Sequence, residues 1–157
     1  NQAPNTISLH LNSTQSNLTI NYGQTSNASA YISFGSVSLF KNNSAVSNPD
    51  IQNLPAGYHI YLANSSGDFN HTSNSTYFSV TVNQIPSVTT LHLNSSQDNL
   101  TQTFGESVNA SAYCDYGTPS LYLNSTSVSN PYIQTLGSEY YNFTAYCSGD
   151  SNHSQSL

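Results

Sequence analysis

The stretch Thr76-Tyr-Phe-Ser-Val-Thr-Val82 decides how this chain is organised. Apolar and polar residues alternate along it, and β-branched and aromatic side chains dominate, so it predicts a β-strand. It follows residues 1–75, which align without a gap on residues 83–157 at a fixed offset of 82 residues, with 36 identities. The second copy contains no counterpart of the strand. We therefore predict a complete domain over residues 1–82 and a second domain, over residues 83–157, that lacks its final strand.

Each copy consists of short β-rich runs separated by clusters of Gly, Pro, Asn and Ser, without helical periodicity. In the first copy the pattern predicts seven strands, near residues 6–12, 17–22, 27–33, 37–41, 49–53, 57–64 and 76–82. Seven short strands in about 80 residues are typical of a two-sheet sandwich. The expected fold class is therefore all-β, with two tandem β-sandwiches.

Composition argues against several classes of function. Charged residues make up only 5% of the chain, and Lys41 is the single basic side chain. Because a phosphate-binding surface needs clustered Lys and Arg, neither nucleic acid nor an anionic membrane is an expected partner. No segment reaches the roughly 20 apolar residues of a membrane-spanning helix. Neither a nucleophile elbow nor a His-Asp constellation is visible, so we expect no enzymatic activity and no cofactor.

Thirteen asparagines stand in the N-glycosylation acceptor pattern Asn-x-Ser/Thr. They are Asn12, Asn17, Asn27, Asn42, Asn64, Asn70, Asn74, Asn94, Asn99, Asn109, Asn124, Asn142 and Asn152. Strand alternation places Asn12, Asn109 and Asn142 on the face opposite the apolar residues. A dense coat of N-linked glycans would supply the solubility that charged side chains usually supply, which predicts an extracellular, cell-surface protein. The alternative is that a chain rich in Asn, Ser and Thr contains such triplets by accident.

Short motifs recur in the two copies. They are Leu-x-Leu in the first predicted strand, Tyr22-Gly23 or Phe104-Gly105 before Asn-Ala-Ser-Ala-Tyr, and Ser-Gly-Asp-x-Asn near the end; Pro-Ala-Gly-Tyr58 occurs in the first copy. With these motifs the chain resembles the immunoglobulin-like repeats of bacterial and archaeal surface proteins, to which Tyr146-Cys-Ser-Gly-Asp-Ser-Asn152 is the nearer match. The density of acceptor triplets also makes it similar to the glycosylated subunits of archaeal thread-type filaments. The resemblance implies immunoglobulin-like sandwiches and says little about activity.

The same resemblance gives the two cysteines a role. Cys114 and Cys147 fall at inward positions of two strands that would lie in facing sheets, where immunoglobulin domains carry an inter-sheet disulfide. It therefore implies a Cys114–Cys147 bond that braces the copy without its final strand. A metal pair or a redox couple is the alternative, although no companion His/Cys pattern is present.

Lys41 shares a strand face with Val37 and Leu39, which allows a partly inward position. In pilin-like immunoglobulin domains a buried lysine can form an isopeptide bond with Asn or Asp, helped by a nearby carboxyl. An exposed lysine at the end of a strand is the alternative. The histidines that repeat at the offset are expected at the surface and not as metal ligands.

The open end of the second copy suggests assembly. Unpaired backbone groups at a sheet edge can pair with an extended segment of another copy, and a head-to-tail contact of this kind produces an open fibre. We therefore expect identical subunits to form a glycosylated extracellular filament by donor-strand complementation, with Ile7, Leu9 and Leu11 of the N-terminal segment as inward plugs. Because that segment is also the predicted first strand of its own domain, a covalent tandem array and a frayed end remain as alternatives.

A second function also fits the sequence, namely an adhesin or stalk module that binds glycans or a surface through exposed aromatic side chains. The candidate residues are Tyr116, Tyr122, Tyr132, Tyr140 and Tyr141, all in the second copy. Tyrosines in β-rich sequence also serve in packing or lie beneath glycans.

Overall fold

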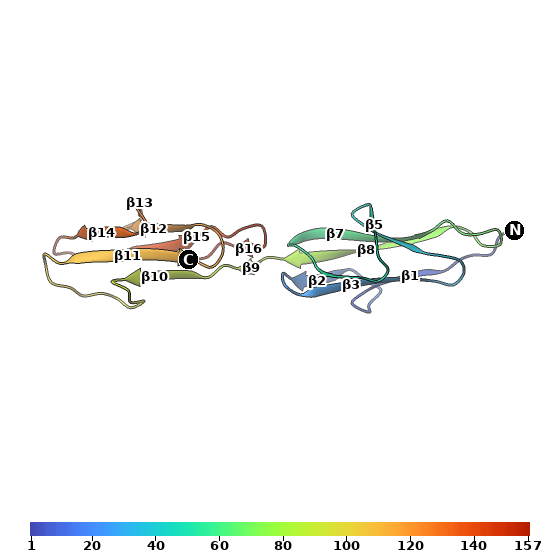
Figure 1. The fold of residues 1–157 in the computed structure, drawn as a ribbon, viewed down its shortest axis with the longest axis horizontal. Coiled ribbons are helices and arrows are strands. Elements are labelled where there is room, and N and C mark those ends of the chain that lie inside the picture. The colour runs from blue at the N-terminus through green and yellow to red at the C-terminus, as the bar shows by residue number, and fades with distance from the viewer. The chain divides into compact units, whose positions relative to one another are not determined.

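The structure, a computed structural model, describes residues 1–157 and consists of strands joined by turns and loops (Figure 1). The expected all-β fold class is confirmed. No helix is present that is long and apolar enough to cross a membrane. The residues separate into two compact units, Asn1–Gln84 and Ile85–Leu157, called here the first unit and the second unit.

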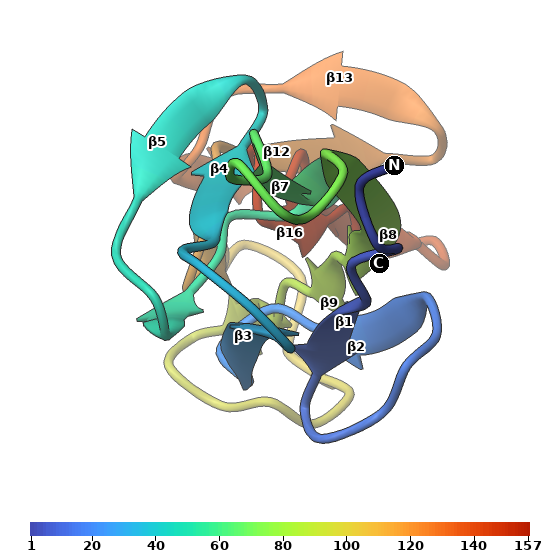
Figure 2. The same cartoon turned by 90° about the vertical axis from the view of Figure 1, so that its right-hand side faces the viewer.

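Two sheets form the first unit. One has the order β1-β3-β6 and contains β1 (Ile7–Leu11), β3 (Thr25–Ile32) and β6 (Asp50–Asn53). The other has the order β2-β8-β7-β4-β5 and contains β2 (Leu18–Asn21), β8 (Asn74–Asn83), β7 (Gly57–Ser65), β4 (Ser38–Lys41) and β5 (Ser44–Val46). In Figure 2, β1 and β3 lie in one layer, and β4 and β7 in the other.

Both sheets contribute to one core, because alternate residues of each strand face inward. Leu9 and Leu11 of β1 and Val80 and Val82 of β8 have at most 3% of their surface exposed. Small residues of β3, Ala28 among them, let the sheets approach closely. The first unit is thus a two-sheet sandwich whose core depends on both its first and its last strand.

The second unit repeats one of these sheets in full. This sheet has the order β10-β11-β14, with β10 (Thr89–Leu93), β11 (Ser107–Cys114) and β14 (Tyr132–Thr135). The other has the order β13-β12-β15, with β12 (Pro119–Leu123), β13 (Thr126–Val128) and β15 (Phe143–Cys147). A short parallel pair joins β9 (Ile85–Pro86) to β16 (His153–Ser154). The sheet β13-β12-β15 therefore has three strands where its counterpart in the first unit has five. No strand within residues 85–157 matches β2 or β8.

All seven strands predicted in the first copy are present, with ends that differ by one or two residues. The prediction missed β5, whose three residues are too few to show alternation. The boundary between the units lies after Gln84 and not after Val82, because Asn83 still pairs with Asn21 in the ladder between β8 and β2.

Four asparagines of the acceptor triplets shape hairpin turns. Asn12, Asn42, Asn94 and Asn124 have φ angles between 46° and 49°, and the residue after each also has positive φ. Two consecutive residues of positive φ form the tight turn that suits twisted hairpins, and asparagine tolerates this conformation. The side-chain oxygen of each also accepts a hydrogen bond of 2.7–2.9 Å from a backbone N–H of an adjacent segment. These asparagines therefore have a structural role before any glycan is attached.

The predicted disulfide between Cys114 and Cys147 is confirmed, with the two Cα atoms 5.7 Å apart. It joins the last residue of β11 to the last residue of β15, and so links the two sheets of the second unit. The corresponding residues of the first unit are Ile32 and Ser65, so that unit has no such bond.

Candidate strand-binding groove in the second unit

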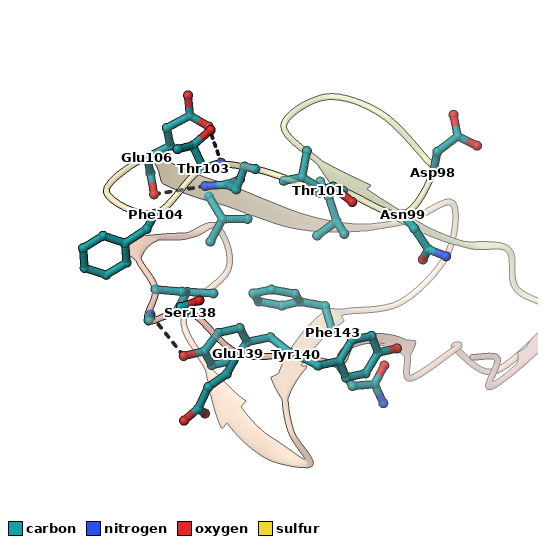
Figure 3. Close-up of a pocket in the computed structure, with 18 of the residues that line it drawn as sticks. Asp98, Asn99, Thr101, Thr103, Phe104, Glu106, Ser138, Glu139, Tyr140 and Phe143 are labelled. Atoms are coloured by element: carbon teal, nitrogen blue, oxygen red, sulfur yellow. Dashed lines mark hydrogen bonds between the residues drawn. The ribbon is translucent and has the colours of Figure 1, made fainter.

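A cavity of about 520 Å³ opens on the second unit. It lies between residues 97–106 and residues 136–142, two segments outside the strands that Figure 3 shows as facing walls. Leu91 and Leu93 of β10 and Phe143 of β15 supply much of its apolar lining, and Phe143 projects into the space between the walls. This cavity is called here the groove.

The first unit shows what fills the equivalent space. There β8 lies between β2 and β7. It runs parallel to β2, from the pair Leu18 and Val80 to the pair Asn21 and Asn83. It also runs antiparallel to β7 along the whole length of that strand. A complete unit therefore holds its last strand by hydrogen bonds on both edges.

Both walls of the groove lose strand structure where this partner is absent. In the first unit β7 has nine residues, but β15 has five, and the counterparts of the first four residues of β7, residues 139–142, lie outside it. Residues 100–103, the counterpart of β2, are not in a strand either. The turn that follows them is unchanged, because Thr103 N donates to Glu106 Oε2 just as Asn21 N donates to Gln24 Oε1. The turn next to this wall is therefore formed as in the first unit.

The core beneath the groove is correspondingly exposed. Leu9 and Leu11 are completely buried in the first unit, whereas their counterparts Leu91 and Leu93 are half-buried. Full burial of a leucine side chain stabilises a fold by about 1.5–3 kcal/mol relative to exposure. A strand in the groove would therefore gain from covering these leucines as well as from pairing its backbone.

The first pair of such a ladder is already formed. Cys147 N donates to Ser156 O at 2.9 Å, and Ser156 N donates to Cys147 O at 3.1 Å. This bridge is the counterpart of the pair between Ser65 and Asn74, where β8 begins in the first unit. Beyond it, the free edge of β15 has no partner within residues 85–157.

The predicted donor residues lie in the first strand of their own unit. Ile7, Leu9 and Leu11 belong to β1, which pairs with β3 of its own unit along its full length. Leu9 and Leu11 are completely buried there. These residues contribute to the core of their own unit in this structure, and their role as plugs in another copy stays a prediction.

Lys41 is half-buried beside a buried carboxylate. Its Nζ lies 3.9 Å from Oδ2 of Asp50, and Tyr61 Oη donates a hydrogen bond of 2.8 Å to the same oxygen. Burial, together with the Asp50 carboxylate, raises the pKa of Tyr61. The structure brings one carboxyl, that of Asp50, to Lys41, and the isopeptide bond stays a prediction. The geometry is that of an ion pair across the sandwich.

Each unit also contains a stack of an aromatic ring on a histidine that contacts an aspartate. The members are Phe34, His71 and Asp68 in the first unit, and Tyr116, His153 and Asp150 in the second. The stacked ring centroids are 4.2 and 3.5 Å apart, and histidine Nδ1 lies 2.9 and 2.8 Å from the carboxylate. No group of three or more His, Cys, Asp or Glu side chains is arranged to hold a metal ion. Each stack joins the segment that carries the aromatic residue to the segment that carries the histidine and the aspartate.

The acceptor asparagines all reach the surface. Eleven of the thirteen are exposed, and Asn27 and Asn152 are half-buried. Asn99 and Asn142 line the groove, one on each wall. Solvent therefore reaches every predicted acceptor residue.

The five tyrosines that the sequence offers as a ligand surface are spread over different features. Tyr116 stacks on His153, and Tyr132 packs against Phe143. Tyr140 and Tyr141 line the groove, and Tyr122 lines a separate shallow hollow. They form no common platform, so the adhesin function gains no support from their arrangement.

No protein-family model matches the sequence, and no curated protein matches it. Among solved structures, the fibronectin(III)-like modules of CbhA from Clostridium thermocellum are similar over 95% of this chain and 89% of that chain. The sequence identity is 12% and the TM-score is 0.35. No activity or partner follows from this likeness.

Proposed function

We propose that this chain is a structural subunit of an N-glycosylated extracellular filament, in which the groove of the second unit accepts an extended strand from a neighbouring subunit. The groove is the observation that carries the proposal. It has two unpaired edges, at β15 and at residues 100–103, in the place that β8 occupies in the first unit. Within residues 1–157, β7 pairs with β8, whereas the corresponding edge of β15 has no such partner, and this difference supports the proposal.

Addition of a strand would pair the free backbone groups at the edge of β15 in the second unit. Backbone N–H and C=O groups at a free sheet edge favour pairing with another chain, and main-chain hydrogen bonds of this kind provide affinity. A subunit that accepts a strand from one neighbour in its groove and donates a strand to another makes a contact between two different surfaces. A contact of this type does not close on itself, so it generates a fibre.

Three further observations support a glycosylated extracellular location. The Cys114–Cys147 disulfide is typical of proteins from oxidising compartments. The thirteen acceptor asparagines lie exposed or half-buried. With Lys41 as the only basic side chain, the surface has few charges, and a glycan coat would supply the missing solubility.

Electron microscopy of native material tests the proposal when it is combined with intact-mass measurement under denaturing and reducing conditions. We expect filaments that dissociate under these conditions into separate chains, whose mass falls when the glycans are released chemically. Filaments composed of chains with many units would replace strand exchange by a covalent array. Dispersed single subunits, or chains without glycan, would contradict the proposal.

A further inference from the structure

In the first unit an asparagine side chain holds the last strand in position. The Oδ1 atom of Asn17 accepts a hydrogen bond of 3.0 Å from the backbone N of Ser79 in β8. Asn17 comes directly before β2, so this contact lies on the edge of β8 opposite β7. The parallel ladder begins at the next residue, where Leu18 pairs with Val80. The amide therefore marks the start of the ladder and fixes which residue of β8 enters it.

The second unit has an asparagine at the same position, but no strand lies beside it to donate the hydrogen bond. Asn99 is the counterpart of Asn17, and both are followed by Leu and Thr. Asn99 is exposed and lines the groove, and Figure 3 shows it on the wall formed by residues 98–106. Its side chain has no hydrogen-bond partner in the structure, whereas the Asn17 side chain has Ser79.

We infer that Asn99 sets the register of the strand that enters the groove, by accepting a hydrogen bond from one backbone N–H of that strand. The N–H is the one at the position that Ser79 holds in β8. A shift of one residue would turn the apolar side chains of the strand to the other face. A shift of two would move the matching N–H by about 6–7 Å along the strand and leave Asn99 unbonded.

The same geometry defines the chemistry of the entering strand. Val80 and Val82, one and three residues after Ser79, fill the core of the first unit. The strand therefore needs branched apolar residues at these two positions to cover Leu91 and Leu93. Its assignment to a neighbouring copy rests on the proposed function, whereas the role of Asn99 rests on the comparison of the two units.

Register selection is compatible with glycosylation of the same residue. An N-linked glycan is attached at Nδ2, which leaves Oδ1 of Asn99 free to accept a hydrogen bond. The hydroxyl residue of the acceptor triplet is Thr101, which is exposed. Thr101 itself lines the groove, so the control is made at Asn99. Asn99→Asp removes the glycan but keeps a side-chain oxygen that can accept the hydrogen bond, while Asn99→Ala removes both.

A synthetic peptide with the sequence of residues 74–83, added to the full chain, tests the inference. We expect binding that slows hydrogen exchange in residues 100–103 and 139–147. One lost hydrogen bond corresponds to roughly a fivefold change in affinity, so Asn99→Ala should weaken peptide binding by about that factor. Asn99→Asp, the matched control, should bind at least as tightly as the wild type does. Equal affinity for Asn99→Ala and Asn99→Asp would overturn the inference.

An N-methylated peptide isolates the contact from general effects of the substitution on folding. Methylation of the backbone nitrogen at the Ser79 position removes the N–H that Asn99 should accept. We expect this peptide to bind the wild type more weakly than the unmodified peptide does, and to bind Asn99→Ala with much the same affinity as the unmodified peptide. An equal penalty on both proteins would exclude the hydrogen bond.

The outcomes separate this inference from the proposed function. If native material forms no filaments but the peptide shows the Asn99-dependent penalty, the role of Asn99 stands and the filament function fails. If filaments form but Asn99→Ala binds the peptide as well as its control does, the role of Asn99 is excluded and the filament function stands. If the peptide does not bind, but a chain extended after Leu157 by the sequence of residues 76–82 shows protected walls, a strand in the same polypeptide replaces the neighbouring copy.

Discussion

Val80 lies beside Leu18 in the parallel ladder between β8 and β2, and its side chain is completely buried. The counterpart of Leu18 is Leu100, which lines the groove and belongs to no strand. The sequence Leu-Thr therefore forms a strand in one unit and an irregular wall in the other. Two differences accompany this change: the second unit has no strand beside Leu100, and the core residue Ile20 of β2 is replaced by Gln102.

A charge at Val80 should open the first unit. Because the side chain is fully buried in the core, Val80→Asp should destabilise this unit by roughly 3 kcal/mol or more. Thr81→Asp is the matched control, since Thr81 is half-buried beside it and alternation turns it away from the core. Urea unfolding measures the stability, and hydrogen exchange reports on β2. Similar losses for the two variants would contradict the role given to Val80.

Removal of the disulfide should affect the second unit selectively. Cys114 and Cys147 are 33 residues apart, and closing a loop of this size contributes about 3–4 kcal/mol in the chain-entropy model. The double variant Cys114→Ala/Cys147→Ala should therefore lower the unfolding midpoint of residues 85–157 and leave β7 and β8 protected. Hydrogen exchange during a urea titration distinguishes the two units. An unchanged second unit would show that the bond is not a brace.

The turn asparagines should matter for folding even without glycans. Asn42 has positive φ, and its Oδ1 accepts a hydrogen bond of 2.9 Å from Ile60 N. Asn42→Ala loses both features and should lower the stability of unglycosylated protein by about 1–2 kcal/mol. Ser44→Ala abolishes the same acceptor triplet but leaves the turn intact, so it should be nearly neutral. Thermal unfolding compares the two, and equal melting temperatures would refute a structural role for Asn42.

Stability should fall only in strong acid. A hydrogen bond from the His71 side chain lowers the pKa of Asp68, and bonds from backbone N–H groups lower the pKa of Asp115 and Asp150. Because these pKa values are lower in the folded state, the ionised carboxylates stabilise it above the unfolded value of 3.8. The melting temperature should therefore stay nearly constant from pH 7 to about 4.5 and fall below about 4. A steep loss already between pH 7 and 5 would contradict this assignment.

The sequence alone predicts much of the fold, because the strands are long enough to alternate. The cysteine pairing also follows, through the family resemblance. The sequence does not show that residues 139–142 lie outside a strand, although their counterparts belong to β7. Strand structure there depends on pairing with a neighbouring strand, and the alignment shows only that residues 83–157 contain no counterpart of that strand. Comparing Asn17 with Asn99 at the repeat offset is the signal that could have located the groove wall.

Other contacts were beyond sequence reasoning because they join separate elements. Lys41 lies on β4 and Asp50 on β6, in different sheets, so only the packed sandwich brings them together. The stack of Phe34 on His71 likewise joins two loops that no periodicity connects. Leu9 and Leu11 of β1, predicted as donor residues, are completely buried in the core of their own unit, and their donor role stays a prediction.

The parallel ladder between β2 and β8 has a mechanical consequence. When the chain is pulled from both ends, β2 is drawn towards its N-terminus and β8 towards its C-terminus, so the ladder from Leu18 and Val80 to Asn21 and Asn83 is loaded in shear. Its hydrogen bonds must then break together and not one after another. The first unit thus contains a ladder that resists tension in shear. The second unit would gain an equivalent ladder when a strand pairs beside Leu100.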